Sequence, residues 1–135
     1  MNMKKTLPLM LSAVLLAGCS APVGETDNAA GAYVQTTADE AIEMMQAEQD
    51  YIILDVRTPE EFAEKHIPGA INVPNETIGK EEIAELPDKD QAIFVYCRSG
   101  NRSKQASEKL VALGYTNVIE FGGINSWTGE TVSGK

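Results

Sequence analysis

An alternation of short apolar runs with helical patterns is the feature that most constrains the fold of this chain. The runs with the length and apolar, β-rich composition of strands are residues 33–35, 51–56, 70–73, 92–96 and 117–121. The segments between them with helical spacing or helix-start signals are 37–49, 58–65, 75–86 and 103–113. The run at 51–56 is continuously apolar up to Asp55, as expected for a strand that is covered on both faces. The alternation therefore predicts an α/β fold: a five-stranded parallel, doubly wound sheet with helices on both faces.

Two of the expected helices begin with a capping signal. Thr37 with Glu40, and Thr58 with Glu61, have the spacing at which a hydroxyl and a carboxylate satisfy the free N–H groups of a helix start. Pro59 stands at the first helical position, where its missing N–H costs nothing. These signals place helix starts at both sites.

The stretch with the clearest chemistry is Cys97-Arg98-Ser99-Gly100-Asn101-Arg102-Ser103. It follows the apolar run at 92–96 and precedes the helical pattern at 103–113. The cysteine therefore stands at the carboxyl end of a strand, where open α/β sheets place their functional sites.

The residue types of this loop suit an activated thiolate above an anion-binding cradle. Arg98 and Arg102 supply positive charge that stabilises a thiolate, and the helix N-terminus adds unpaired N–H groups. Gly100 and Asn101 tolerate positive φ, so the loop can turn its amides inward. The alternative is a buried structural cysteine before an ordinary helix start, which two arginines and a glycine in the next five positions disfavour.

Charge and cysteine content narrow the function further. The formal net charge is −9, from 11 basic and 20 acidic residues, which argues against a nucleic-acid partner. The only basic cluster lies between Asp90 and Glu108, on the cysteine loop. The two cysteines, Cys19 and Cys97, and the single histidine give no disulfide framework and no metal-ligand spacing, so we expect neither a metal nor another cofactor.

The amino-terminal residues have the form of an export segment. Residues 1–18 combine two lysines with a short apolar run, which is typical of a signal peptide. They end at Leu16-Ala17-Gly18-Cys19, which resembles the lipobox of bacterial lipoproteins. We therefore expect a lipid on Cys19, a flexible tether over 19–32, and a protein anchored in the bacterial cell envelope, in the outer membrane and facing the periplasm. An ordinary secretory signal with an incidental cysteine is the alternative.

The cysteine loop resembles the active-site loop of the rhodanese (thiosulfate sulfurtransferase) family. Residues 54–62 and 66–74 are similar to the amino-terminal signature of that family, and 114–127 to its carboxyl-terminal one. The resemblance covers 33–130 and leaves 131–135 as a tail. Lys65 departs from the pattern, because the family commonly has glycine before the histidine.

The resemblance implies a single-domain rhodanese fold and a double displacement. We expect a monomer, because the fold needs no partner. Cys97 would take the outer sulfur of thiosulfate or a similar anionic donor as a persulfide and pass it to cyanide or a thiol. Arg98 would bind the donor sulfonate, and Arg102 would close the ring. The backbone amides that would hold the outer sulfur belong to residues 98–102, which are Arg98, Ser99, Gly100, Asn101 and Arg102.

Other assignments remain open for several of these residues. Surface salt bridging is the alternative role for both arginines. Asp55 and Arg57, at the end of another strand on the same sheet edge, could support the loop or simply pair with each other. His66 belongs to a helix–strand turn, which favours a structural histidine over a catalytic base.

Two other functions compete with sulfur transfer. Cysteine phosphatases and some arsenate reductases also combine a cysteine, a cradle of amides and a terminal arginine. Their loops place five residues between cysteine and arginine, whereas four separate Cys97 from Arg102, and the smaller ring suits a single sulfur atom. A non-enzymatic persulfide carrier or binding module is the second competitor, and the intact cysteine weakens the binding-only form of it.

Overall fold

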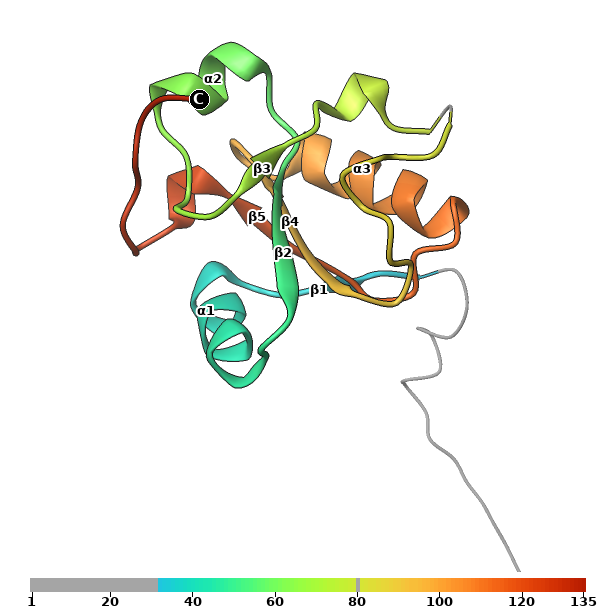
Figure 1. The fold of residues 1–135 in the computed structure, drawn as a ribbon. Coiled ribbons are helices and arrows are strands. Elements are labelled where there is room, and N and C mark those ends of the chain that lie inside the picture. Colours follow the sequence, from blue (N-terminus) through green and yellow to red (C-terminus); the bar gives the residue numbers. More distant parts are fainter. Residues whose placement is uncertain (1–31, 80) are drawn as a thin grey trace, which may run out of the picture.

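The computed structural model describes residues 32–79 and 81–135, and it contains one five-stranded parallel sheet (Figure 1). The strands are β1 (Val34–Gln35), β2 (Tyr51–Asp55), β3 (Ile71–Asn72), β4 (Ala92–Cys97) and β5 (Val118–Gly123). Their spatial order is β1-β5-β4-β2-β3, and every pair of neighbours is parallel. The α/β class and the five-stranded parallel sheet expected from the sequence are confirmed.

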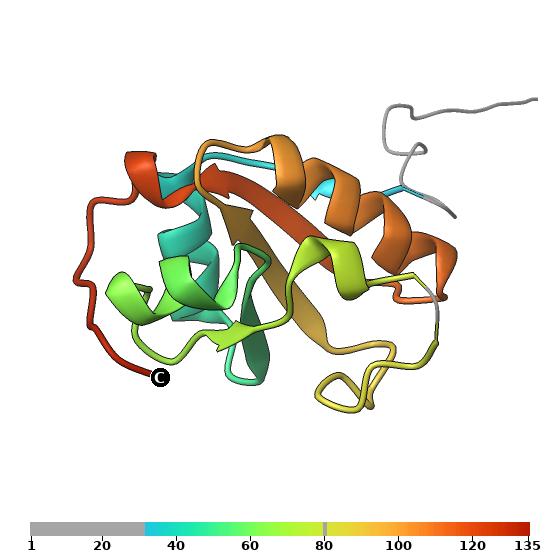
Figure 2. The same ribbon diagram turned by 90° about the horizontal axis from the view of Figure 1, so that it is seen from above.

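Helices cover both faces of this sheet (Figures 1 and 2). The helices are α1 (Ala38–Ala47), α2 (Pro59–Glu64) and α3 (Asn101–Ala112), with short 3₁₀ turns η2 (Asn75–Thr77) and η3 (Ile124–Ser126). Over the described residues, no helix combines the length and the apolar character needed to cross a bilayer.

The central strand β4 divides the core into two clusters because successive side chains of a strand point to opposite faces. Ile93, Val95 and Cys97 face a cluster that includes Leu110 of α3. Phe94 and Tyr96 face the second cluster, which contains the buried residues of α1. All six residues of β4 are buried. The strand that ends in the cysteine is therefore held from both sides.

Both capping signals mark real helix starts. Thr58 and Glu61 complete the capping box at α2, with each side chain accepting from the other residue's backbone N–H. At α1, the Thr37 hydroxyl accepts from the N–H of Glu40, whereas the Glu40 carboxylate instead accepts from the hydroxyl of Thr36.

The prediction of a helix over 75–86 is wrong. Only η2 forms there, because Ile78 is extended and Gly79 has a φ of 113°, a left-handed value that interrupts a helix. Ile83 and Leu86 are nevertheless buried in the same cluster as Leu110. The apolar residues of this segment thus pack as an irregular loop.

Candidate active site

The cysteine loop joins the carboxyl end of β4 to α3, and the backbone of β5 supports it. Gly100 is the N-cap of α3 and has a φ of 119°, which favours glycine. Gly123 lies so close to the loop that a Cβ there would stand 2.0 Å from the carbonyl oxygen of Arg98. Asn125 donates its backbone N–H to the same carbonyl at 3.2 Å. A glycine at 123 is therefore required for the loop to sit against β5.

The Cys97 thiol lies beneath this loop and is 1% exposed. Its Sγ accepts a hydrogen bond from the Gly100 N–H at 3.0 Å and lies 3.5 Å from the Ser103 hydroxyl. The unpaired N–H groups at the start of α3 add partial positive charge on the same side. The arrangement can stabilise negative charge on the sulfur.

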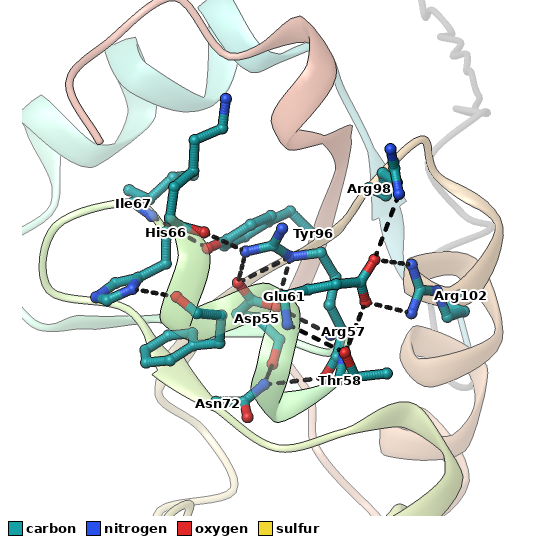
Figure 3. Close-up of polar contacts among 12 residues, drawn as sticks. Asp55, Arg57, Thr58, Glu61, His66, Ile67, Asn72, Tyr96, Arg98 and Arg102 are labelled. Atoms are coloured by element: carbon teal, nitrogen blue, oxygen red, sulfur yellow. Dashed lines mark hydrogen bonds and ion pairs between the residues drawn. The ribbon is translucent and has the colours of Figure 1, made fainter. Parts of the chain in front are cut away.

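Both loop arginines turn toward one carboxylate, that of Glu61 on α2 (Figure 3). Arg102 forms a two-pronged pair with it, at 2.9 Å to Oε1 and 3.2 Å to Oε2. Arg98 is more weakly held, with 3.8 Å between its Nη1 and Glu61 Oε2 and a side chain that is 66% exposed. Glu61 thus holds the two arginines unequally, Arg102 firmly and Arg98 loosely.

The bond from Arg102 is the main reason why the pKa of Glu61 is lowered from 4.5 to about 2. The same hydrogen bond raises the pKa of Arg102. Glu61 also caps α2 through Thr58, so one ionised side chain fixes both the helix start and the arginine. The sequence marks Glu61 only as a capping residue, because 41 positions separate it from Arg102.

Asp55 and Arg57 pair with each other at the end of β2, with 2.7 Å between Asp55 Oδ2 and Arg57 Nη2. Both are buried, and Arg57 also donates to the carbonyl of Lys65 at 2.7 Å. Asn72 of β3 donates to the backbone carbonyls of Asp55 and Arg57, both at 3.0 Å (Figure 3). This pair therefore ties β2 to the turn after α2 and to β3.

The remaining expected site residues lie in different places. Ser99 is exposed on the loop, Asn101 is exposed at the first position of α3, and Cys19 lies outside the described residues. His66 is buried, stacks on Phe62 at 3.7 Å between ring centroids, and has Nδ1 2.8 Å from the carbonyl oxygen of Phe62. These contacts indicate that His66 has a structural role, which agrees with the expectation from the sequence.

A second residue that sequence reasoning missed is Glu120 of β5. It is 2% exposed, and its carboxylate accepts from the Ser103 hydroxyl at 2.5 Å and from the Gly122 N–H at 2.9 Å. A charge in the otherwise apolar run Val118-Ile119-Glu120-Phe121 is the signal that could have found it.

A polar cavity of about 400 Å³ opens beside the loop. Its lining mixes both signs of charge and consists of Arg57, Glu61, Glu64, Lys65, Arg98, Ile124 and Asn125. Within the part of the chain that the structure describes, no group of three or more His, Cys, Asp or Glu side chains is placed to hold a metal ion.

Comparisons with known proteins agree on one family. The family model described as "Rhodanese-like domain" matches residues 37–130. "Thiosulfate sulfurtransferase PspE" of Escherichia coli (strain K12) is 38% identical over 81 residues, which are 60% of this chain and 78% of that protein. "Adenylyltransferase and sulfurtransferase UBA4" of Candida albicans is 40% identical over 97 residues, but these span 67% of this chain and only 22% of that protein. The solved structure "rhodanese with anions from E. coli" has a TM-score of 0.58 and 37% identity over 62% of this chain and 99% of that one.

The Glu61–Arg102 pair should make the free energy of unfolding of the domain decrease as the pH falls below 4.5. Because the pKa of Glu61 is about 2 when folded and 4.5 otherwise, its contribution is complete above pH 4.5 and disappears as the pH falls toward 2. We expect Glu61→Gln to lower the free energy of unfolding at pH 7 by about 1 to 2 kcal/mol, after allowance for solvent screening. The measurement is urea unfolding of both proteins between pH 7 and pH 2.5. A native–variant difference that does not shrink below pH 4.5 would contradict the assignment.

Proposed function

The chain belongs to the rhodanese-like domain family, and on that premise we propose that it is a thiosulfate sulfurtransferase that carries sulfur on Cys97. The observation that carries the proposal is the buried Cys97 sulfur, which accepts the Gly100 N–H at 3.0 Å at the start of α3. A backbone N–H that points at the sulfur at the start of a helix is an arrangement that supports cysteine as a nucleophile. Sulfurtransferase relatives support the same class of reaction.

The first displacement forms a persulfide. The Cys97 thiolate attacks the outer sulfur of thiosulfate, the sulfur–sulfur bond of the donor breaks, and sulfite leaves with the electron pair. The second displacement transfers the terminal sulfur to an acceptor thiolate or cyanide and restores the Cys97 thiolate. Hydrogen bonds from the loop backbone would stabilise the charged sulfur in both steps.

The unequal pairing of the two arginines suggests different roles. Arg98 is mostly exposed and only loosely held by Glu61, so it is free to bind the sulfonate of the donor. Arg102 is fixed by its two short bonds to Glu61, and it acts from there as a steady positive charge near the sulfur. A dianionic donor suits this combination better than a neutral one.

The cavity favours a charged thiol over cyanide as the acceptor. Cyanide has two heavy atoms, whereas a cavity of about 400 Å³ has the size of a site for a small organic ligand. Lys65 is exposed in its lining and forms no ion pair with any residue that the structure describes. We propose a low-molecular-mass thiol whose carboxylate Lys65 attracts.

We further propose that the protein is exported and lipid-anchored through Cys19 in the bacterial cell envelope, at the outer membrane and facing the periplasm. The support is the sequence of residues 1–18 followed by Cys19, with Leu16-Ala17-Gly18 immediately before the cysteine. A lipid with two or more acyl chains on one residue gives firm anchoring.

Cys97→Ser should abolish persulfide formation. We expect the native domain, residues 20–135, to gain the mass of one sulfur atom on incubation with thiosulfate and to lose it on addition of cyanide. The variant should gain none, while circular dichroism shows an unchanged fold. Intact mass spectrometry is the measurement. Release of phosphate from a phosphate ester, with no gain of sulfur, would instead support the phosphatase alternative.

Lys65→Gln should weaken the binding of acceptor thiols that carry a carboxylate, and leave the binding of neutral thiols unchanged. We expect the KM of the thiosulfate-loaded enzyme for 3-mercaptopropionate to rise about threefold, the size of an exposed ion pair, while the KM for neutral 2-mercaptoethanol is unchanged. The matched control is Lys104→Gln, an exposed lysine outside the cavity lining. Equal changes for both thiols, or an effect of the control, would remove the role of Lys65.

Cys19→Ser should release the protein from the membrane fraction if Cys19 carries the lipid. We expect incorporation of radioactive palmitate into the full chain expressed in a bacterium, and none into the variant. Labelling that persists in the variant would show that the lipid, if any, is elsewhere. A native protein that is unlabelled but present in the periplasm would favour the ordinary secretory signal.

A further inference from the structure

The buried carboxylate of Glu120 lies below the loop without a positively charged partner among the described residues. It accepts hydrogen bonds from the Ser103 hydroxyl at 2.5 Å, from the Gly122 N–H at 2.9 Å and, more weakly, from Gln35 Nε2 at 3.4 Å. Burying a carboxylate is costly unless it is paired or hydrogen-bonded. The position of this acid, one serine away from the thiol, indicates that it acts on the site.

Ser103 connects this carboxylate to the thiol. Its hydroxyl oxygen is 2.5 Å from Glu120 Oε2 and 3.5 Å from Cys97 Sγ, and the side chain is fully buried. A hydroxyl has one proton to donate and two lone pairs with which to accept. While it donates to Glu120, it can accept the proton of the thiol. The carbonyls of Gly100 and Gly122, at 3.0 and 3.2 Å, are weaker acceptors than an ionised carboxylate.

We propose that Glu120, acting through Ser103, takes up the proton that Cys97 loses when the thiolate forms. The S–H bond breaks and its proton passes to Ser103 Oγ, while the hydroxyl proton of Ser103 passes to Glu120 Oε2. The electron pair of the broken bond stays on Sγ. The three groups carry one negative charge before and after the step, and no co-reactant is needed. Glu120 is a positioning residue in this scheme, and Ser103 is the group that touches the reacting sulfur.

The surroundings favour this movement of charge toward the sulfur. Cys97 faces the Gly100 N–H, the start of α3 and the positive charge of Arg102, which Glu61 partly balances. The titratable group that faces Glu120 from the segment before β1 is Tyr33, whose pKa is raised by burial first and then by Glu108 and Glu120. The negative charge therefore leaves Glu120, which has no cationic partner among the described residues, and arrives at Cys97, which lies near Arg102.

The test is the rate of alkylation of Cys97 by iodoacetamide between pH 5 and pH 11, in the native domain and in Glu120→Gln. If Glu120 takes the proton as the sulfur attacks, the native rate should level off between pH 5 and pH 7, whereas the rate of the variant should keep falling with its thiolate, about tenfold per pH unit. If Glu120 is only a nearby negative charge, its removal favours the thiolate and makes the variant react faster at low pH. The first role therefore predicts a slower variant at low pH and the second a faster one. A superimposable or acid-shifted profile would overturn the proposal.

Two Ser103 variants keep the proposal testable if Glu120→Gln does not fold. Ser103→Ala breaks the hydrogen bonds between Cys97 and Glu120 and should remove the level part of the profile at low pH, whereas Ser103→Thr keeps the hydroxyl and should leave the profile near the native one. Native-like profiles in both variants would reject the scheme. The inference rests on the proposed function only in taking Cys97 as the reacting atom. Alkylation needs no sulfur donor, so a failure of sulfur transfer and a failure of this scheme are distinguishable.

Discussion

The hydrogen bonds and ion pairs of the Glu61 carboxylate are the interactions on which the part of the domain around the cysteine loop depends. This carboxylate caps the first turn of α2 and, at the same time, holds Arg102 and approaches Arg98 on the loop after β4. Without it, the start of α2 would lose a hydrogen-bond acceptor and Arg102 would lose both of its short bonds. Because one side chain serves both elements, the position of α2 and the direction of the arginines are set together.

A second carboxylate–guanidinium pair, Asp55–Arg57, also connects two elements, and it lies at the end of β2. It is buried, and Arg57 reaches the carbonyl of Lys65, so the end of β2 and the turn after α2 form one unit. Breaking a buried pair of this kind leaves a charge without a partner, which is strongly destabilising. Arg57 and Glu61, which both line the cavity, are therefore each fixed by an ion pair, and Arg57 also holds the backbone of Lys65.

The sequence allowed the sheet to be predicted because each strand is a short apolar run between clear turn residues. It misled at residues 75–86, where core residues such as Ile83 and Leu86 fit a helix although Gly79 interrupts one. The loop at Cys97 could be predicted because its residues are contiguous. Glu61 and Glu120 could not be assigned to it, because 41 and 17 positions separate them from their partners, Arg102 and Ser103, and only the fold brings them together.

The parallel sheet also fixes the direction in which the cavity faces. In the described chain, β1 runs parallel to β5, with Val34 opposite Ile119, while the cysteine loop stands at the other end of β5, beside Gly123. Residues 32–33 therefore join the sheet at the amino ends of its strands, whereas Cys97 lies at the carboxyl ends. The cavity and the amino ends of the strands thus lie at opposite ends of the domain, and a ligand that enters the cavity from solution does not pass the point at which residues 32–33 join the sheet.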